Sequence, residues 1–336
     1  MQSISNKIGK ILPRKFHYCD VGARRGIEVP WKSFRNIIDL ISFEPDIVEY
    51  NSLQKDKIQN DKIFPYALTN DCKEVTLNLT KSRGCSSLYK PNLKYLKNYP
   101  DVERFFVEDT VTVETTSLDT LYNDKVFSNI DFIKIDTQGA ELDILKGGEK
   151  FLSKNILGIE VEIEFQPIYE NQPLFSDIDS FIRNHLGLQI QDLRKSYWKY
   201  PVGINIGSPK GQLIFGDALY FRSPYEILSL CSHFQKSDAA SKLLNACLMG
   251  IVYGYLDFSL CILNQPSIND FVDKEITNQW KNLIINYGKS LRYSRMGSGR
   301  LSNLLNILYR ICHPTQEGWA SLGHHLGSRK KFGIFN

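Results

Sequence analysis

Three carboxylate side chains close predicted strands in the first half of the chain. Asp20 ends the apolar run FHYCD, Glu44 ends ISFE, and Asp136 ends FIKID. Ligands in open α/β sheets bind at the carboxyl ends of the strands, so these residues are candidates for one site. A carboxylate placed there can accept hydrogen bonds from ribose hydroxyls, or it can take a proton from a reacting hydroxyl group.

Two glycines follow the first of these carboxylates, at Gly22 and Gly26 in DVGARRG. Glycine permits a positive φ and lets a ligand approach the backbone, although a tight turn without a ligand is the alternative. Arg24 stands where the middle glycine of G-x-G-x-x-G is needed, which disfavours an NAD-linked oxidoreductase. Glu44 follows 24 residues after Asp20. The joint pattern favours a nucleoside with free 2′ and 3′ hydroxyls and a small ionic group, as in S-adenosylmethionine.

The candidate bases lie in the fourth and fifth predicted strands. Asp136 either faces the ligand or caps the helix that begins near Gly139. EVEIEF places Glu160, Glu162 and Glu164 on one face of a strand, and buried carboxylates must be paired or bind something. Glu164 lies nearest the carboxyl end of its strand, so we predict that it contacts the acceptor. Asp136 and Glu164 are oxygen ligands of the kind that Mg²⁺ prefers, but a third is missing and no metal is predicted.

Acceptor contacts are predicted in two loops. GCSSL contributes Ser86 and Ser87, which we expect to line the acceptor pocket. QPIYENQPLF contributes Tyr169 and Gln172, whose phenol and amide can hydrogen-bond a polyol. The alternative for the aromatic side chain is packing beneath a loop.

The order of the predicted elements indicates how these residues are held. Short apolar runs alternate with helix-compatible stretches from Phe16 to about Phe165, which predicts crossover connections and a parallel sheet. Residues 74–79 and 109–118 alternate like strands and predict a β excursion that carries the loop TKSRGCSSLYKP. After residue 223 the apolar residues recur with a helical period.

Six segments together resemble the FkbM-type S-adenosylmethionine-dependent methyltransferases: DVGARRG, SFEPD, TSLDTL, DFIKIDTQGAELDILKGG, EVEIEFQPIYENQPLF and FGDALYFR. The resemblance covers roughly residues 16–222 and is most specific at KIDTQGAELDILKG. It implies a class I methyltransferase (Rossmann-like) α/β fold, with a mostly parallel seven-stranded sheet, one antiparallel edge strand and helices on both faces.

The resemblance also implies methyl transfer from S-adenosylmethionine to a hydroxyl oxygen of a sugar, glycan or related natural product. Arg24 then either meets the cofactor carboxylate or points to solvent. The expected cofactor contacts are Asp20, Gly22, Ala23, Arg24, Gly26, Glu44, Pro45 and Ala67.

We divide the chain into a methyltransferase domain, residues 1–222, and a helical extension, residues 223–336, which the resemblance does not cover. The extension is expected to act as a lid, an oligomer contact or a partner dock, and residues 1–222 are expected to fold without it. A second hypothesis is a non-catalytic cofactor-binding module that recruits a partner in glycan biosynthesis through this extension.

Composition and charge limit the other functional classes. The net charge of +4 is too small to predict nucleic-acid binding. Residues 223–336 hold 12 basic and 7 acidic side chains. This excess of basic residues is better explained by a solvated surface than by a site for a polyanion or a membrane. Seven scattered cysteines without a C-x-x-C pair, and no signal peptide, predict a cytoplasmic protein. No apolar run reaches the roughly 18 residues of a membrane span.

Overall fold

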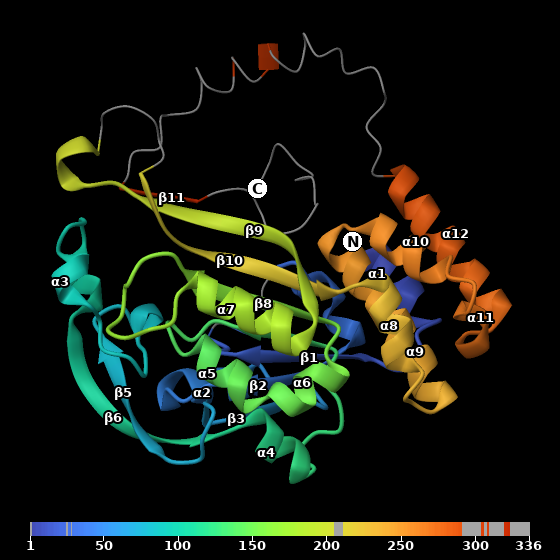
Figure 1. Ribbon diagram of the computed structural model, residues 1–336, viewed down its shortest axis with the longest axis horizontal. Helices are drawn as coiled ribbons and strands as arrows, with labels where there is room; N and C mark the ends of the chain where they lie inside the picture. Colours follow the sequence, from blue (N-terminus) through green and yellow to red (C-terminus); the bar gives the residue numbers. More distant parts are fainter. Residues whose placement is uncertain are drawn as a thin grey trace.

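A central sheet organises the protein (Figure 1). The computed structural model describes residues 2–24, 26–27, 29–204, 211–290, 304–305, 308 and 319–322. The strand order is β11-β9-β10-β8-β7-β1-β2-β3. The strands are β1 (Phe16–Val21), β2 (Ile38–Phe43), β3 (Lys62–Phe64), β7 (Phe132–Ile135), β8 (Gly158–Glu164), β9 (Leu188–Trp198), β10 (Gln212–Arg222) and β11 (Ala320–Leu322).

The class I methyltransferase fold expected from the sequence is confirmed, with two differences in the sheet. Strands β8, β7, β1, β2 and β3 pair in parallel, whereas β10 is antiparallel to both β8 and β9. The antiparallel strand therefore lies inside the sheet and not at its edge, because β10 returns from β9 and inserts beside β8. The short strand β11 adds an eighth member next to β9.

The predicted β excursion is a second sheet of three strands in the order β4-β6-β5. Strands β5 and β6 form an antiparallel pair, and the connection between them carries the turns η2 and η3 and helix α3. We call residues 81–92 of this connection the acceptor loop. The elements are β4 (Ala67–Leu68), β5 (Glu74–Thr80), η2 (Arg83–Cys85), α3 (Leu93–Leu96), η3 (Val102–Phe105) and β6 (Val107–Thr116).

One face of the main sheet is covered by helices from the middle of the chain. Their apolar side chains pack on Ile133, Ile135 and Val161 in one buried cluster. Residues 140–153, one of the helix-compatible stretches, form two helices that meet at Gly148. A Cβ at Gly147 would lie 2.1 Å from the backbone oxygen of Thr69, so this helix approaches the chain after β4 closely. The helices are α4 (Leu118–Asn123), α5 (Glu141–Gly147), α6 (Glu149–Asn155) and α7 (Phe175–Phe181), followed by the π-turn η4 (Ile182–Leu186).

The opposite face is covered by elements that precede β2 and by the helices that follow β10 (Figure 1). Fourteen of the eighteen residues of α9 are buried, and Leu243, Leu244 and Cys247 share a core cluster with Phe16 and Phe132 of the sheet. The elements of this layer are α1 (Gln2–Gly9), η1 (Trp31–Ile37), α8 (Pro224–Cys231), α9 (Lys236–Tyr253), α10 (Leu256–Leu263), α11 (Ile268–Phe271) and α12 (Lys274–Ser290). Helix α2 (Ile47–Lys55) and the turn η5 (Pro201–Gly203) complete the described elements.

The boundary between residues 222 and 223 separates β10 from α8 in the chain, but the hydrophobic core is continuous across it. The division into two domains therefore stays a prediction, and the shared core argues against independent folding of residues 1–222. The helical pattern of residues 300–312 falls largely outside the described residues, as do all the basic side chains after residue 290.

A buried ionic cluster links the segment before β1 and helix α9 to the start of β7. The Asp131 carboxylate accepts hydrogen bonds from Arg14 at 2.9 and 3.0 Å, from Lys242 at 3.2 Å and from Asn245 at 2.8 Å. Burial alone raises the pKa of Asp131, but Lys242 and Arg14 outweigh it and hold this pKa well below its usual range. The carboxylate is thus ionised and paired with cations from two distant segments.

Within the described residues, no helix combines the length and the apolar character needed to cross a bilayer. The six described cysteines carry free thiols.

Candidate active site

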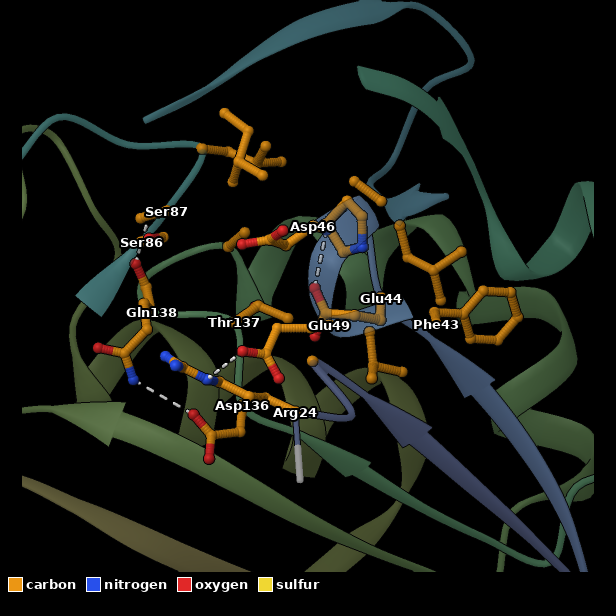
Figure 2. Close-up of a pocket in the computed structure, with 18 of the residues that line it drawn as sticks. Arg24, Phe43, Glu44, Asp46, Glu49, Ser86, Ser87, Asp136, Thr137 and Gln138 are labelled. Carbon is orange, nitrogen blue, oxygen red and sulfur yellow. Dashed lines mark hydrogen bonds and ion pairs between the residues drawn. The ribbon is translucent and has the colours of Figure 1, made fainter. Parts of the chain in front are cut away.

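A cavity of about 260 Å³ opens at the carboxyl ends of β1, β2 and β7 (Figure 2). This is the edge at which open α/β sheets bind their ligands. Of the predicted site residues, the cavity wall contains Gly22, Arg24, Glu44, Pro45, Ala67, Ser86, Ser87 and Asp136. The predicted residues that do not line it are Asp20, Ala23, Gly26, Glu164, Tyr169 and Gln172.

The turn after β1 passes close to the end of β7. Gly22 has φ of +77°, and a Cβ at this position would lie 2.0 Å from the carbonyl oxygen of Asp136. Only glycine fits here, since both the left-handed backbone and the close approach exclude a side chain. Gly26, with φ of +70°, closes the same turn away from the cavity, while Asp20 and Ala23 are buried behind it. The two glycines therefore shape the turn after β1, and Gly22 is the one that lines the cavity.

Glu44 follows β2 directly and is 6% exposed. Its Oε1 accepts a hydrogen bond from the backbone N–H of Asp46 at 2.9 Å. Burial raises the pKa of Glu44 to about 7, although this hydrogen bond and Arg24 oppose the shift. The carboxyl group therefore changes charge near neutral pH unless a ligand fixes its state.

An apolar slot adjoins Glu44. It is formed by Phe43, Pro45, Tyr66, Ala67 and Leu68, from the ends of β2 and β3 and from β4. The rings of Phe43 and Phe64 stack with centroids 5.4 Å apart, and those of Phe64 and Tyr66 stack at 6.0 Å. A planar ring system suits such a slot.

Arg24 spans the mouth of the cavity and does not point to bulk solvent. Its Nε lies 3.3 Å from Glu49 Oε1 on α2, and a Cβ at Gly84 would lie 3.3 Å from its Nη1. The guanidinium therefore stands between the β1 turn and the acceptor loop, where it can meet an anionic group of a ligand.

Asp136 faces the cavity and does not cap the following helix. Helix α5 has no side-chain cap at Ala140; instead the Glu141 carboxylate accepts the backbone N–H groups of Thr137 at 2.8 Å and Gly139 at 2.9 Å. Asp136 Oδ2 lies 3.4 Å from Lys134 Nζ, and its Oδ1 accepts from Gln138 Nε2 at 3.2 Å. The capping interpretation of Asp136 is thus wrong, because no side-chain hydrogen bond caps the start of α5.

The carboxylate row of β8 meets the cavity at Glu162 and not at Glu164. The ladder between β7 and β8 ends at the pair Ile135 and Val161, so Glu162 lies just beyond the end of β7. Glu164 lies further along and is 1% exposed under the chain that follows. Burial, followed by repulsion from Asp136, raises the pKa of Glu162 well above its usual range. Glu162 and not Glu164 thus lines the cavity, and the acceptor contact of Glu164 stays a prediction.

Tyr169 and Gln172 do not line the cavity and are buried next to residues that do. Tyr169 is fully buried and donates hydrogen bonds to the Cys85 carbonyl at 3.0 Å and to Gln138 Oε1 at 2.9 Å. The Gln172 side chain accepts from the backbone N–H of Tyr169. These two residues therefore pack beneath the acceptor loop, and the expectation that they contact a polyol is not met in this arrangement.

Sequence reasoning missed several residues of the wall. The most informative are Arg83, Lys134, Thr137, Gln138 and Glu162. Thr137 and Gln138 directly follow a strand that was predicted to end at the ligand site, so their position in the chain was the available signal. Among the described residues, no cluster of His, Cys, Asp or Glu side chains is arranged to hold a metal ion.

Comparisons with solved structures find methyltransferases. The chain is similar to methyltransferase FkbM from Methylobacillus flagellatus KT, with 16% identity, a TM-score of 0.37, and coverage of 62% of this chain and 43% of that one. It is similar to magnesium protoporphyrin IX methyltransferase (ChlM) from Synechocystis PCC 6803 with bound SAM, with 9% identity, a TM-score of 0.33, and coverage of 66% and 79%. M. capricolum TrmK in complex with S-adenosyl-homocysteine follows, with 16% identity, a TM-score of 0.28, and coverage of 86% and 97%.

The family assignment comes from sequence and not from these distant similarities. No curated protein matches the chain. The model of the Methyltransferase FkbM domain matches residues 20–187, which is half of the chain and contains every residue that lines the cavity. The protein is therefore a member of the FkbM methyltransferase family.

Proposed function

We propose that the protein transfers a methyl group from S-adenosylmethionine to a hydroxyl oxygen of a sugar, glycan or related natural product. The observation that carries this proposal is that Glu44, Gly22 and Asp136 line a single cavity. Residues suited to binding a nucleoside, Gly22 and Glu44, therefore line the same cavity as Asp136, whose carboxylate is suited to accepting a proton.

The wall of the cavity fits the parts of S-adenosylmethionine. The Glu44 carboxylate is placed to accept hydrogen bonds from the ribose hydroxyls, and the neighbouring apolar slot suits the adenine ring. The turn at Gly22 borders the part of the cavity that we assign to the amino-acid end of the molecule, and the Arg24 guanidinium suits pairing with its carboxylate. When bound, this cofactor supplies a methyl group on a positively charged sulfur.

Asp136 is the proposed general base. The Lys134 ammonium group pairs with this carboxylate at 3.4 Å. With the cofactor bound, Asp136 would take the proton of the acceptor hydroxyl, whose oxygen would receive the methyl group that the cofactor supplies. Positioning of the two reactants can supply on the order of 7–11 kcal/mol of the barrier reduction. Burial and repulsion from Asp136 raise the pKa of Glu162 well above its usual range, which favours the protonated form, and in that form Glu162 can donate a hydrogen bond to the acceptor.

The acceptor side of the cavity is polar. It is formed by Arg83, Ser86 and Ser87 of the acceptor loop, by Gln138 after β7 and by Glu162 of β8. A site with this many hydrogen-bonding groups suits a polyhydroxylated molecule, since a flat apolar acceptor would leave those groups unpaired. This supports a sugar or glycan as the acceptor.

Calorimetry with S-adenosylmethionine and S-adenosylhomocysteine tests the cofactor assignment. We expect both to bind, and the absence of binding to folded protein would contradict the proposal. Methyl transfer to a panel of sugars and glycans, followed with a labelled methyl group, then tests the acceptor class. Asp136→Ala is expected to bind cofactor without turnover. A wild-type protein that binds cofactor and methylates nothing in the panel would favour the non-catalytic module.

A further inference from the structure

Gln138 occupies an unusual position between the cavity and the acceptor loop. It follows β7 by three residues, and its φ of +60° is left-handed, a conformation that a glutamine rarely adopts. The next residue, Gly139, has φ of +112°. These two backbone conformations turn the Gln138 side chain back over the end of β7 and into the cavity wall (Figure 2).

Both ends of the Gln138 amide have partners. The Nε2 group donates to Asp136 Oδ1 at 3.2 Å and to Glu162 Oε2, so each of its two N–H bonds meets one carboxyl group. The Oε1 atom accepts from the Tyr169 hydroxyl at 2.9 Å. The amide orientation is therefore set from both sides, and its donor end is directed at the two carboxyl groups of the cavity.

The backbone of Gln138 is also bound to the acceptor loop. The Ser87 hydroxyl donates to the Gln138 carbonyl oxygen at 2.6 Å, and the Tyr169 hydroxyl that meets the side chain also donates to the carbonyl of Cys85. The acceptor loop is thus joined to the two carboxyl groups through a single residue.

We propose that Gln138 is a positioning residue that holds Asp136 and Glu162 in a fixed geometry for methyl transfer, and that couples both to the acceptor loop. This inference rests on the proposed function. Donation from an amide N–H favours the ionised form of a carboxyl group. Gln138 therefore opposes the burial and repulsion that raise the pKa of Glu162, and its loss should raise that pKa further.

The surroundings of Glu162 decide how the test is designed. The charged groups that face it are Asp136 and Lys134 from β7, Glu160 and Glu164 from its own strand, Glu141 from α5, and Asp217 of β10, which pairs with Arg194 of β9 at 2.7 Å. Gln138 is the uncharged donor in this group. Replacing it changes hydrogen bonding to Glu162 without changing any of these charges.

The test is a titration of Glu162 in the full-length protein by ¹³C-carboxyl NMR, with the signal assigned by its loss in Glu162→Gln. Gln138→Asn keeps the amide and tolerates the left-handed backbone, but it is one methylene too short to reach both carboxyl groups. We expect its Glu162 midpoint to rise by about one pH unit, the effect of losing one donor to a charged group. Gln138→Gly serves as a second variant, because it removes the amide and accepts the backbone conformation. Gln189→Asn, on the exposed side of β9, is the matched control and should change nothing.

Binding of S-adenosylhomocysteine is measured on the same proteins. We expect the affinity of the Gln138 variants for S-adenosylhomocysteine to stay within about threefold of the wild-type value. The residues proposed to contact the cofactor lie elsewhere in the cavity. An unchanged Glu162 midpoint in both variants would overturn the proposal, and so would a loss of cofactor binding confined to them. Failure of the wild type to bind S-adenosylhomocysteine contradicts the proposed function instead, and leaves the titration as the test of Gln138.

Discussion

A Cβ at Gly22 would lie 2.0 Å from the carbonyl oxygen of Asp136. The turn that is assigned to the cofactor and the residue that is assigned to catalysis are therefore in direct backbone contact. Gly22 and Asp136 are further fixed by ladder hydrogen bonds, from the Gly22 N–H to Phe43 at 3.0 Å and from the Asp136 N–H to Val21 at 3.0 Å. A substitution in either loop should therefore also alter the backbone position of the other.

Gly22→Ala is predicted to weaken cofactor binding. The added methyl group clashes with backbone that cannot move without breaking the ladder, and alanine also disfavours the φ of +77°. Calorimetry with S-adenosylhomocysteine measures the effect, which we expect to be a loss of at least about tenfold in affinity. Gly203→Ala is the control, because a Cβ there has no neighbour within 4 Å and should be neutral. Wild-type affinity in Gly22→Ala would contradict this account of the turn.

Glu44→Gln is predicted to weaken cofactor binding by roughly ten- to a hundredfold, the range expected when a charged hydrogen-bond acceptor is lost. The carboxylate must be ionised to accept from two hydroxyls, and its pKa is raised to about 7 in the free protein. The affinity of the wild type for S-adenosylhomocysteine should therefore increase from pH 6 to pH 8, while that of Glu44→Gln should not. The exposed Glu108→Gln provides a control that should keep the wild-type pH dependence. Equal pH dependence in Glu44→Gln would remove Glu44 from the ribose site.

The stability of the free protein should fall as the pH rises from about 5 to 8. Burial raises the pKa of Glu44, Glu141 and Glu160 to about 7, so near pH 6 the folded state binds more protons than the unfolded state. In that range the free energy of unfolding decreases with pH. Glu162, Glu164 and Asp217 shift in the same direction, whereas burial lowers the pKa of His17, which acts in the opposite sense.

Thermal unfolding at fixed ionic strength measures this effect. Glu160→Gln keeps an acceptor for the Tyr253 hydroxyl and should flatten part of the decline in Tm. A Tm that rises steadily over this pH range would show that these carboxyl groups are not buried in their protonated forms.

Asp131→Asn is predicted to destabilise the protein by about 3–5 kcal/mol, because it leaves the cations of Arg14 and Lys242 without their buried counter-charge. Denaturant unfolding measures the loss. Asp39→Asn removes a half-exposed pair with Lys15 and should cost about 1 kcal/mol or less. Since Lys242 lies on α9, a small effect of Asp131→Asn would indicate that residues 223–336 are held less firmly than the shared core suggests.

Much of the fold follows from the sequence because its signals are local. Apolar runs such as those of β1 and β7, and the alternation in β5 and β6, define strands through contacts that each segment makes on its own two faces. The order of the strands is set by long-range contacts, so the internal place of β10 was not predictable. The same holds for α9, whose burial on nearly every side depends on the sheet face that it covers.

The site was predicted where strand ends carry a distinctive residue, as at Gly22, Glu44 and Asp136. Glu164 was preferred to Glu162 on the assumption that β7 and β8 end at the same level, whereas β7 stops opposite Val161. Asp136 could not be told from a helix cap by sequence, because an aspartate just before a helix is a favoured cap residue. Gln138 gave no signal beyond its place after β7, since its role depends on a left-handed backbone conformation and on partners from three separate segments.

A crystal structure of the protein with S-adenosylhomocysteine is the most direct test of the central claim. We predict that both ribose hydroxyls lie within hydrogen-bond distance of the Glu44 carboxylate and that the sulfur faces the space beside Asp136. A ligand bound elsewhere, or a Glu44 carboxylate that makes no contact with the ribose, would contradict the account.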